Sequence, residues 1–79
     1  MLETKRLEIA DLIRELRQQF GLSQEKLAAS LGVSLRTVNR WENGHTVPSQ
    51  LALKQIEEML RKLGEPAQGL LNQYFLEAE

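Results

Sequence analysis

Hydrophobic residues recur along this chain at intervals of three and four, and glycines at positions 21, 32, 44 and 64 divide the pattern into short segments. Such intervals place apolar side chains along one side of an α-helix, and no segment alternates apolar and polar residues as a half-buried strand would. Aromatic residues make up only 5 % of the chain, which also disfavours strands. The pattern therefore predicts an all-α fold.

We expect a compact five-helix bundle, with helices over about residues 4–20, 23–31, 34–43, 49–63 and 66–77. Hydroxyl side chains can cap a helix start by accepting a hydrogen bond from a free backbone N–H group, and glycine can end a helix in the left-handed conformation. The predicted caps are Thr4, Ser23 and Ser34, and the fourth helix is expected to begin near Ser49, just after Pro48. The residues expected to face inward on the first and fourth helices are Ile9, Leu12, Ile13, Leu16, Phe20, Leu53, Ile56, Leu60 and Leu63.

Length and composition narrow the class of protein. The 79 residues suffice for one domain, residues 1–79, and a content of 42 % hydrophobic and 27 % charged residues is typical of globular proteins. There is no cysteine, and the single histidine, His45, cannot form a metal cluster alone, so we expect no metal and no cofactor. No apolar run approaches a membrane span and the start lacks a signal-peptide core, so we expect a cytoplasmic protein without a membrane contact.

Charge is distributed unevenly along the chain. The net charge of −1 gives no support to nucleic-acid binding. Residues 12–56, however, contain six basic and three acidic residues, whereas residues 57–79 contain two basic and five acidic ones. The middle of the chain can therefore form a local basic surface, and the acidic end would reduce non-specific DNA binding.

A tight turn joins the second and third predicted helices. Ala28 is small where these helices would cross, and Gly32 lies where the turn needs a positive φ. The shared inner face would consist of Leu27, Leu31, Val33, Val38 and Trp41. This arrangement is a helix-turn-helix, whose second helix can enter the major groove of DNA.

A family resemblance rests on four motifs that follow one another without insertion. They are Leu22-Ser23-Gln24-Glu25-Lys26-Leu27-Ala28, Leu31-Gly32-Val33-Ser34, Val38-Asn39-Arg40-Trp41-Glu42-Asn43-Gly44 and Pro48. Over about residues 9–63 the chain resembles the lambda-repressor-like (phage Cro and xenobiotic-response-element type) helix-turn-helix family of DNA-binding proteins. The resemblance implies that family's five-helix fold and its DNA-binding role.

One side of the third helix carries the candidates for reading DNA bases. Its outward stripe consists of Arg36, Asn39, Arg40 and Asn43. Arginine can donate two parallel hydrogen bonds to guanine O6 and N7, and asparagine can pair with adenine N6 and N7. Leu35 lies to one side, where it could touch a thymine methyl group. We interpret Leu35, Arg36, Asn39 and Arg40 as base contacts; the alternative is a solvated helix face.

A second group of residues is assigned to the DNA backbone. Gln24 opens the second helix, where free N–H groups and the helix dipole attract a phosphate, and the matching glutamine of the family contacts the backbone. Asn43 and the following loop match the family's second backbone contact, although the family often has lysine or arginine at the position of His45. Ser34 and Thr37 complete the group. The alternative is that Gln24 and His45 are simply exposed to water.

The resemblance also implies a structural ion pair. In the family, an arginine late in the first helix pairs with the glutamate of the Glu-Asn-Gly turn, and Arg17 and Glu42 match these positions. The pair would brace the third helix against the first, although Arg17 could also reach a phosphate. Trp41 has the helical phase of Val38, so we expect it in the core rather than stacked on a base.

The last predicted helix is the candidate dimer interface. One short helix contacts few base pairs, and proteins of this design usually gain affinity by pairing. Little chain remains to cover the apolar residues of this helix, although they could instead complete the core of the monomer. The interface residues are predicted to be Leu70, Leu71, Tyr74 and Phe75.

Two classes of function remain open. The first is a sequence-specific transcriptional regulator, a repressor that binds double-stranded DNA as a homodimer without a cofactor. The alternative is an antitoxin or other protein-interaction module of the same fold, which would bind a partner protein through its C-terminal helix. An enzyme is disfavoured, because Glu57, Glu58, Glu65 and His45 form no recognisable acid–base pair, phosphate loop or metal-ligand spacing.

Overall fold

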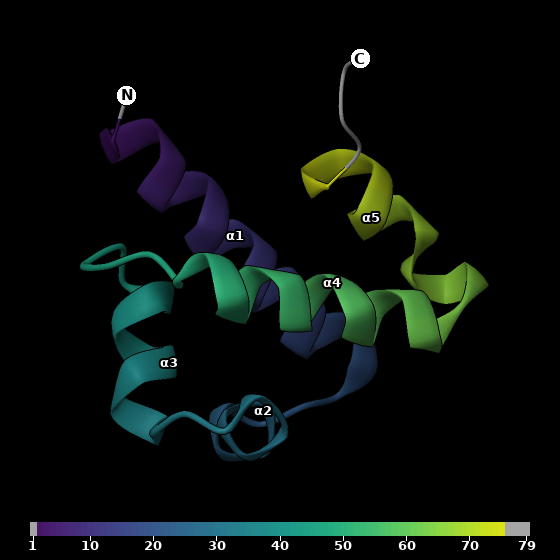
Figure 1. The fold of residues 1–79 in the computed structure, drawn as a ribbon, viewed down its shortest axis with the longest axis horizontal. Helices are drawn as coiled ribbons and strands as arrows, with labels where there is room; N and C mark the ends of the chain where they lie inside the picture. Colours follow the sequence, from purple (N-terminus) through teal and green to yellow (C-terminus); the bar gives the residue numbers. More distant parts are fainter. Residues whose placement is uncertain (1, 76–79) are drawn as a thin grey trace. The chain divides into compact units, whose positions relative to one another are not determined.

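The computed structural model describes residues 2–75, with side chains from residue 7 onward. Within that range every regular element is helical, which confirms the predicted all-α fold with five α-helices. In chain order the elements are α1 Leu2–Phe20, α2 Gln24–Leu31, α3 Leu35–Glu42, α4 Gln50–Leu63, the short 3₁₀ helix η1 Glu65–Ala67 and α5 Gln68–Tyr74 (Figure 1). The chain divides into two compact units, Met1–Pro48 and Ser49–Glu79. The assignment of residues 1–79 to a single domain stays a prediction.

Serine side chains cap the starts of three helices; Ser23 and Ser34 are predicted caps, and the structure adds Ser49. The Oγ atoms of Ser23, Ser34 and Ser49 accept hydrogen bonds from backbone N–H groups three residues later, at 3.0, 3.1 and 3.1 Å. Gly32 ends α2 with a φ of 73°, and its N–H group donates to the carbonyl groups of the last turn. The predicted limits of the helix-turn-helix are therefore confirmed.

The predicted start of the first helix is wrong. α1 begins at Leu2, so Thr4 is its third residue and does not precede its start. Leucine and glutamate are good helix formers, and no residue between Leu2 and Thr4 interrupts a helix. The predicted end is correct, because α1 stops at Phe20 and Gly21 has a φ of 65°.

In the first unit, α3 packs against both α1 and α2. Figure 1 looks almost along α2 while α3 runs across the view, so these two helices cross instead of lying side by side. Phe20 and Val33, which the sequence pattern places inside, are only half-buried, because each lies beside a turn between helices. The buried side chains of this unit include Leu12, Ile13, Leu16, Leu27, Ala28, Leu31, Val38 and Trp41.

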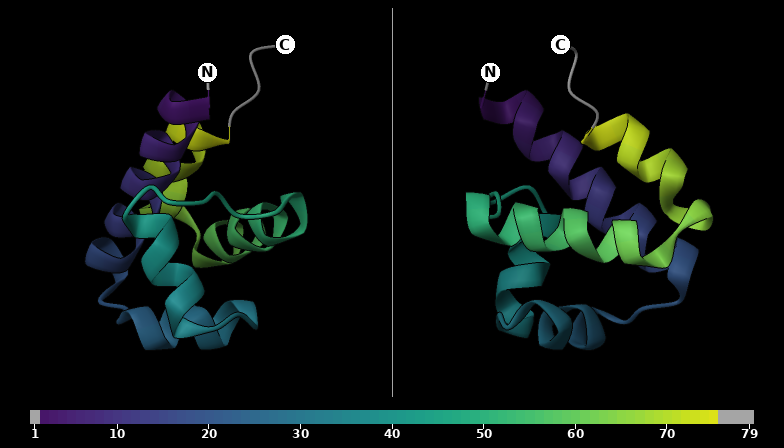
Figure 2. Two further views of the ribbon diagram at one scale, coloured as in Figure 1. Left: turned by 90° about the vertical axis from the view of Figure 1, so that its left-hand side faces the viewer. Right: turned by 45° about the vertical axis from the view of Figure 1, so that its right-hand side comes forward.

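In the second unit, the chain turns back after α4, and α5 contacts α4 (Figure 2). Leu63 is predicted to face inward but is 38 % exposed. It is the last residue of α4, and the backbone leaves the helix at Gly64 with a φ of 79°. Leu53 is half-buried. The buried side chains are Ala52, Ile56, Leu60, Ala67, Leu70 and Leu71.

The predicted fifth helix differs from the structure at its start. The segment begins with the 3₁₀ turn η1, and α5 is α-helical only from Gln68. Pro66 lies in the first turn of η1, where its missing N–H group costs no hydrogen bond. Positions 76 and 77 of the predicted helix lie outside the described residues.

Candidate nucleic-acid interface

The helix α3 has one buried and one exposed side. Its buried residues are Val38, Trp41 and Glu42. Its exposed residues are Leu35, Arg36, Asn39 and Arg40. The helical turn of about 100° per residue produces this division. All four residues predicted to contact bases are thus accessible on a single helix of eight residues.

Arg36 and Arg40 extend from this side without an acidic partner, since neither belongs to an ion pair within the described part of the chain. A guanidinium group carries five N–H donors, no acceptor and a permanent positive charge. Leu35 next to them is 43 % exposed, which adds an apolar group to the charged surface. The exposed side of α3 can therefore offer directed hydrogen bonds and one apolar contact.

Two asparagines at the end of this side pair with each other. The Nδ2 atom of Asn43 donates to the Oδ1 atom of Asn39 at 3.1 Å, across one helical turn. Asn43 follows the last residue of α3, with φ −92° and ψ 5°, and is exposed. The hydrogen bond turns the carbonyl oxygen of Asn39 along the helix toward residue 43. A pattern of residue types does not reveal this orientation.

Two hydroxyl groups lie at the start of α3. The Oγ atom of Ser34 accepts from the backbone N–H of Thr37 at 3.1 Å, and the hydroxyl groups of Ser34 and Thr37 are 2.9 Å apart. Ser34 is exposed and Thr37 is half-buried. Both predicted backbone-contact residues therefore help to start the helix through local hydrogen bonds, and the hydroxyl of Ser34 stays accessible.

Glu42 is the buried carboxylate on the opposite side of α3. Its Oε2 atom accepts a hydrogen bond from Nε of Arg17 on α1, and its Oε1 atom accepts from Nη2 of Arg17 at 3.2 Å. Nε2 of Gln24 on α2 donates to the same Oε1 at 3.0 Å. Nη1 of Arg17 also donates to the backbone oxygen of Leu22 at 3.1 Å. One carboxylate thus joins all three helices of the first unit.

Arg14 makes a further contact to the end of α3. Its Nη2 atom donates to the backbone oxygen of Glu42 at 2.7 Å, and its Nη1 atom lies 3.4 Å from Oδ1 of Asp11. The last carbonyl groups of a helix lack partners within the helix and carry partial negative charge. Arg14 therefore satisfies one of these groups with a charged donor.

The environment of Glu42 shifts the pKa values of both members of the ion pair. Burial acts to raise the pKa of Glu42, but the hydrogen bonds from Arg17 and Gln24 and the positive charges of Arg17 and Arg14 outweigh it. The pKa of Glu42 is therefore lowered from its ordinary value. The hydrogen bond to Glu42 raises the pKa of Arg17 against the opposing effect of burial. Both shifts favour the charged pair.

Gln24 lies in a different setting from the predicted one. The sequence predicts a residue free to contact a phosphate, whereas the structure places Gln24 half-buried with its amide donating to Glu42. Sequence reasoning missed Arg14 altogether. The spacing of three between Arg14 and Arg17 puts both on one side of α1, but the acceptor of Arg14 is a backbone oxygen 28 positions away, which no residue pattern displays.

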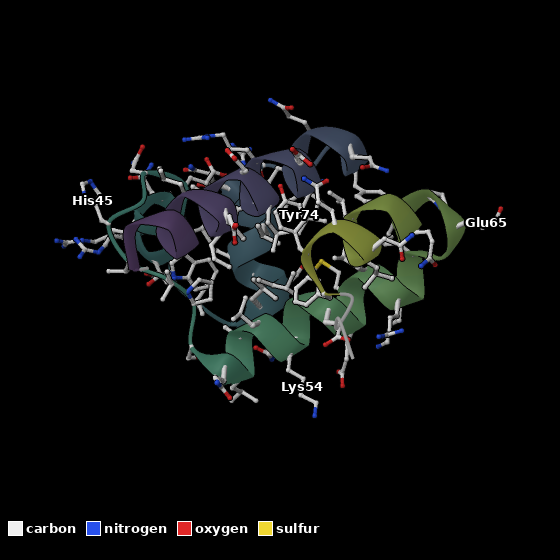
Figure 3. The ribbon with its side chains drawn as sticks, turned by 90° about the horizontal axis from the view of Figure 1, so that it is seen from above. His45, Lys54, Glu65 and Tyr74 are labelled. Atoms are coloured by element: carbon white, nitrogen blue, oxygen red, sulfur yellow. The ribbon has the colours of Figure 1, made fainter. Side chains whose placement is uncertain are left out.

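The loop after α3 exposes His45. Figure 3 shows this side chain projecting away from the ribbon. The backbone N–H of His45 donates to the carbonyl of Arg40 at 3.0 Å, and Gly44 adopts a φ of 74°. The loop is therefore held by backbone hydrogen bonds, and the imidazole is accessible to a ligand.

The predicted dimer residues fall into two groups. Leu70 and Leu71 are 4 % and 7 % exposed in the single chain, so little of either remains for a partner. Tyr74 and Phe75 are half-buried. Within the second unit, Tyr74 and Phe75 therefore retain more accessible surface than Leu70 and Leu71.

The described residues contain no group of three or more histidine, cysteine or acidic side chains that could hold a metal ion. Among the same residues, no helix combines the length and the apolar composition needed to cross a bilayer.

A family model described as helix-turn-helix matches residues 13–64 of the chain. The matched range includes the capped helices α2 and α3, the buried Glu42 and the exposed side of α3. A comparison with solved structures found no significant match.

Several curated proteins are similar to the chain over part of its length. An uncharacterized HTH-type transcriptional regulator of Methanothermobacter thermautotrophicus is 41 % identical over 49 residues, which are 62 % of this chain and 71 % of that protein. A putative HTH-type transcriptional regulatory protein of Natronomonas pharaonis is 40 % identical over 60 residues, 76 % of this chain and 19 % of that protein. The type II methyltransferase M1.ScrFI of Lactococcus lactis is 44 % identical over 52 residues, 62 % of this chain and 13 % of that protein. The chain thus spans less than a fifth of the last two relatives.

Proposed function

Because the chain belongs to the lambda-repressor-like helix-turn-helix family, we propose that it is a sequence-specific DNA-binding transcriptional regulator. The observation that carries the proposal is the exposed side of α3, where Arg36 and Arg40 have no acidic partner in the described residues. A helix of this width fits the major groove, and arginine forms bidentate hydrogen bonds with guanine there. Two relatives named as HTH-type transcriptional regulators support this function.

Base contacts are assigned to the exposed side of α3. Arg36 and Arg40 would donate to guanine, Asn39 would contact a neighbouring base, and Leu35 would touch a thymine methyl group. The hydrogen bonds of Glu42 with Arg17 and Gln24 support this role, because they attach the buried side of α3 to α1 and α2 and leave the other side free. A base-reading helix needs such a fixed orientation to discriminate between sequences.

Backbone contacts are assigned to residues around the two ends of the helix pair. Ser34 and Thr37 lie at the start of α3, where the helix dipole favours a phosphate, and Asn43 and His45 lie at its end. Gln24 can use its second amide N–H for a phosphate while the first donates to Glu42. These contacts would set the register of α3 on DNA without reading sequence.

The protein is proposed to act as a homodimer and a repressor in the cytoplasm. A recognition helix of eight residues reads only a few base pairs, and pairing through α5 would double the site. Tyr74 and Phe75 are the most accessible of the four predicted interface residues. A domain that only occupies DNA acts most directly as a repressor, by excluding other proteins from the same site.

No catalysis and no cofactor are assigned to this chain. Its similarity to M1.ScrFI covers 13 % of that methyltransferase, so the enzyme's name does not transfer to the shared segment.

The decisive experiment is selection of bound sequences from a random double-stranded DNA pool. The wild type should enrich a palindromic site with half-sites about 34 Å apart, or a multiple of that spacing. Arg36→Ala and Arg40→Ala should each remove the preference at one position, while His45→Ala should weaken binding to all sequences alike. Failure of the wild type to enrich any sequence, together with a protein complex lost in Tyr74→Ala, would favour the alternative of an antitoxin or other protein-interaction module.

A further inference from the structure

The hydrogen bond between Asn43 and Asn39 bears on which bases α3 can read. Bidentate recognition of adenine by asparagine needs both ends of the amide, with the NH₂ group on N7 and the oxygen on N6–H. Here Oδ1 of Asn39 accepts from Nδ2 of Asn43 at 3.1 Å and is turned along the helix. The NH₂ group of Asn39, on the other arm of the planar amide, is left as its outward edge.

The other exposed polar groups of α3 are donors as well. Arg36 and Arg40 can only donate hydrogen bonds. The one carboxylate of α3 belongs to Glu42, which is buried and accepts from Arg17 and Gln24. The exposed side of α3 therefore presents donors at three neighbouring positions and lacks a free carboxylate.

We propose that Asn43 sets the sequence specificity of the protein by orienting the amide of Asn39, so that α3 selects bases rich in hydrogen-bond acceptors. Guanine presents two acceptors in the major groove, N7 and O6, whereas thymine presents one acceptor beside its methyl group, adenine presents one acceptor and one donor, and cytosine presents a donor. The half-site therefore contains guanine opposite Arg36, Arg40 and Asn39. This inference rests on the proposed function, because it specifies the DNA that the same helix binds.

The test compares variants that keep or reverse the orientation of the amide. Asn43→Asp places a carboxylate, which can only accept, next to Asn39, so the amide must turn its NH₂ group toward residue 43 and its oxygen outward. His45→Asp is the matched control. It adds the same negative charge two positions further along the chain, at a residue that does not hydrogen-bond to Asn39. Asn39→Ala identifies the base position that Asn39 reads. Thermal unfolding of each variant checks that the fold is retained.

Selection from a random DNA pool should show guanine at the position whose preference is lost in Asn39→Ala. In Asn43→Asp, the ratio of guanine to adenine or cytosine at that position should fall by about five- to tenfold, with unchanged guanines opposite Arg36 and Arg40. His45→Asp should weaken binding overall and leave this ratio as in the wild type.

Three results would overturn the inference. The first is adenine, cytosine or thymine as the wild-type base opposite Asn39, and the second is the same ratio in Asn43→Asp and His45→Asp; both leave the proposed DNA-binding function standing. The third is a folded wild type that enriches no sequence, which overturns the proposed function and this inference together.

Discussion

Three arginines in the first unit show how the same residue type takes different roles. Arg17 on α1 has a side chain 26 % exposed and donates to the carboxylate of Glu42, which is 8 % exposed. Arg36 and Arg40 on α3 are exposed and belong to no ion pair within the described residues. In the first case the charge is used inside the protein, and in the second it is available to a ligand.

The difference follows from where each residue sits relative to the helix axis. Glu42 and Arg40 are two positions apart on α3, so they point to nearly opposite sides of one helix. The inner side is attached through a charged and hydrogen-bonded carboxylate, and a buried charge is tolerated only with such partners. The outer side needs no partner because water solvates it. Anchoring and recognition are therefore separable on this helix.

The largest expected effect comes from removing Arg17, the half-buried donor to Glu42. Arg17→Met should lower the free energy of unfolding by about 2–4 kcal/mol. This value lies between the usual cost of losing a hydrogen bond to a charged group and the usual cost of breaking a fully buried ion pair. The same change at the surface, Arg36→Met, should alter it by less than about 0.5 kcal/mol. Urea unfolding at pH 7 measures the free energy of unfolding of both variants, and equal losses would contradict the distinction between Arg17 and Arg36.

The opposite contrast is expected for DNA binding. Arg40→Ala should weaken binding to the selected site by about 1–3 kcal/mol while leaving the free energy of unfolding within about 0.5 kcal/mol of the wild type. Arg40→Lys keeps the charge but loses the bidentate geometry, so it should retain affinity for unselected DNA and lose preference for the selected site. Titrations with selected and scrambled duplexes measure the affinity of each variant for both kinds of DNA. An unchanged preference for the selected duplex in Arg40→Lys would refute a bidentate contact between Arg40 and a base.

Arg14 provides an intermediate case, since its side chain is half exposed but its Nη2 atom holds the backbone oxygen of Glu42. Arg14→Met should cost about 0.5–1.5 kcal/mol of unfolding free energy, the value of one hydrogen bond, with a small additional loss from the helix dipole. The control is Arg61→Met on α4, whose exposed pair with Glu57 lies within one helix. A larger loss of unfolding free energy in Arg61→Met than in Arg14→Met would mean that the contact of Arg14 with α3 contributes little to stability.

The smallest effect is expected from pH. The pKa of Glu42 is lower in the folded protein than its ordinary value of 4.5, so the folded state binds fewer protons than the unfolded state in acid. The stability that the charged carboxylate contributes is present above pH 4.5 and is lost as the pH falls through the folded pKa. The difference in unfolding free energy between wild type and Glu42→Gln should therefore narrow from pH 7 to pH 3. A difference in unfolding free energy that stays constant from pH 7 to pH 3 would contradict the lowered pKa of Glu42.

Local signals were sufficient for most of the helix limits. Ser23, Ser34 and Ser49 cap helices with their own side chains, and Gly32 takes a positive φ, so each boundary depends on a few neighbouring residues. The start of α1 was predicted wrongly, because a serine or threonine can lie inside a helix as well as before it. Leu63 was also misplaced, since a helical stripe ends where the backbone turns.

The site shows the same division between local and distant information. The exposed stripe of α3 could be predicted, because the helical period orders residues within a single element. The family resemblance suggested the pairing of Arg17 with Glu42, and the structure places the two in contact. The contacts of Gln24 and Arg14 with residue 42 could not be predicted, because they join positions 18 and 28 apart.

The sequence by itself determined the helical class, the serine and glycine limits of the helix-turn-helix, and the set of side chains that α3 displays. Each of these follows from spacing along one segment. Only the tertiary structure decided which polar groups are already used. It turned Gln24 toward Glu42, gave Arg14 a backbone acceptor and directed the oxygen of Asn39 to Asn43. The physical reason is that a hydrogen bond depends on position and direction in space, whereas a sequence states only which donors and acceptors exist.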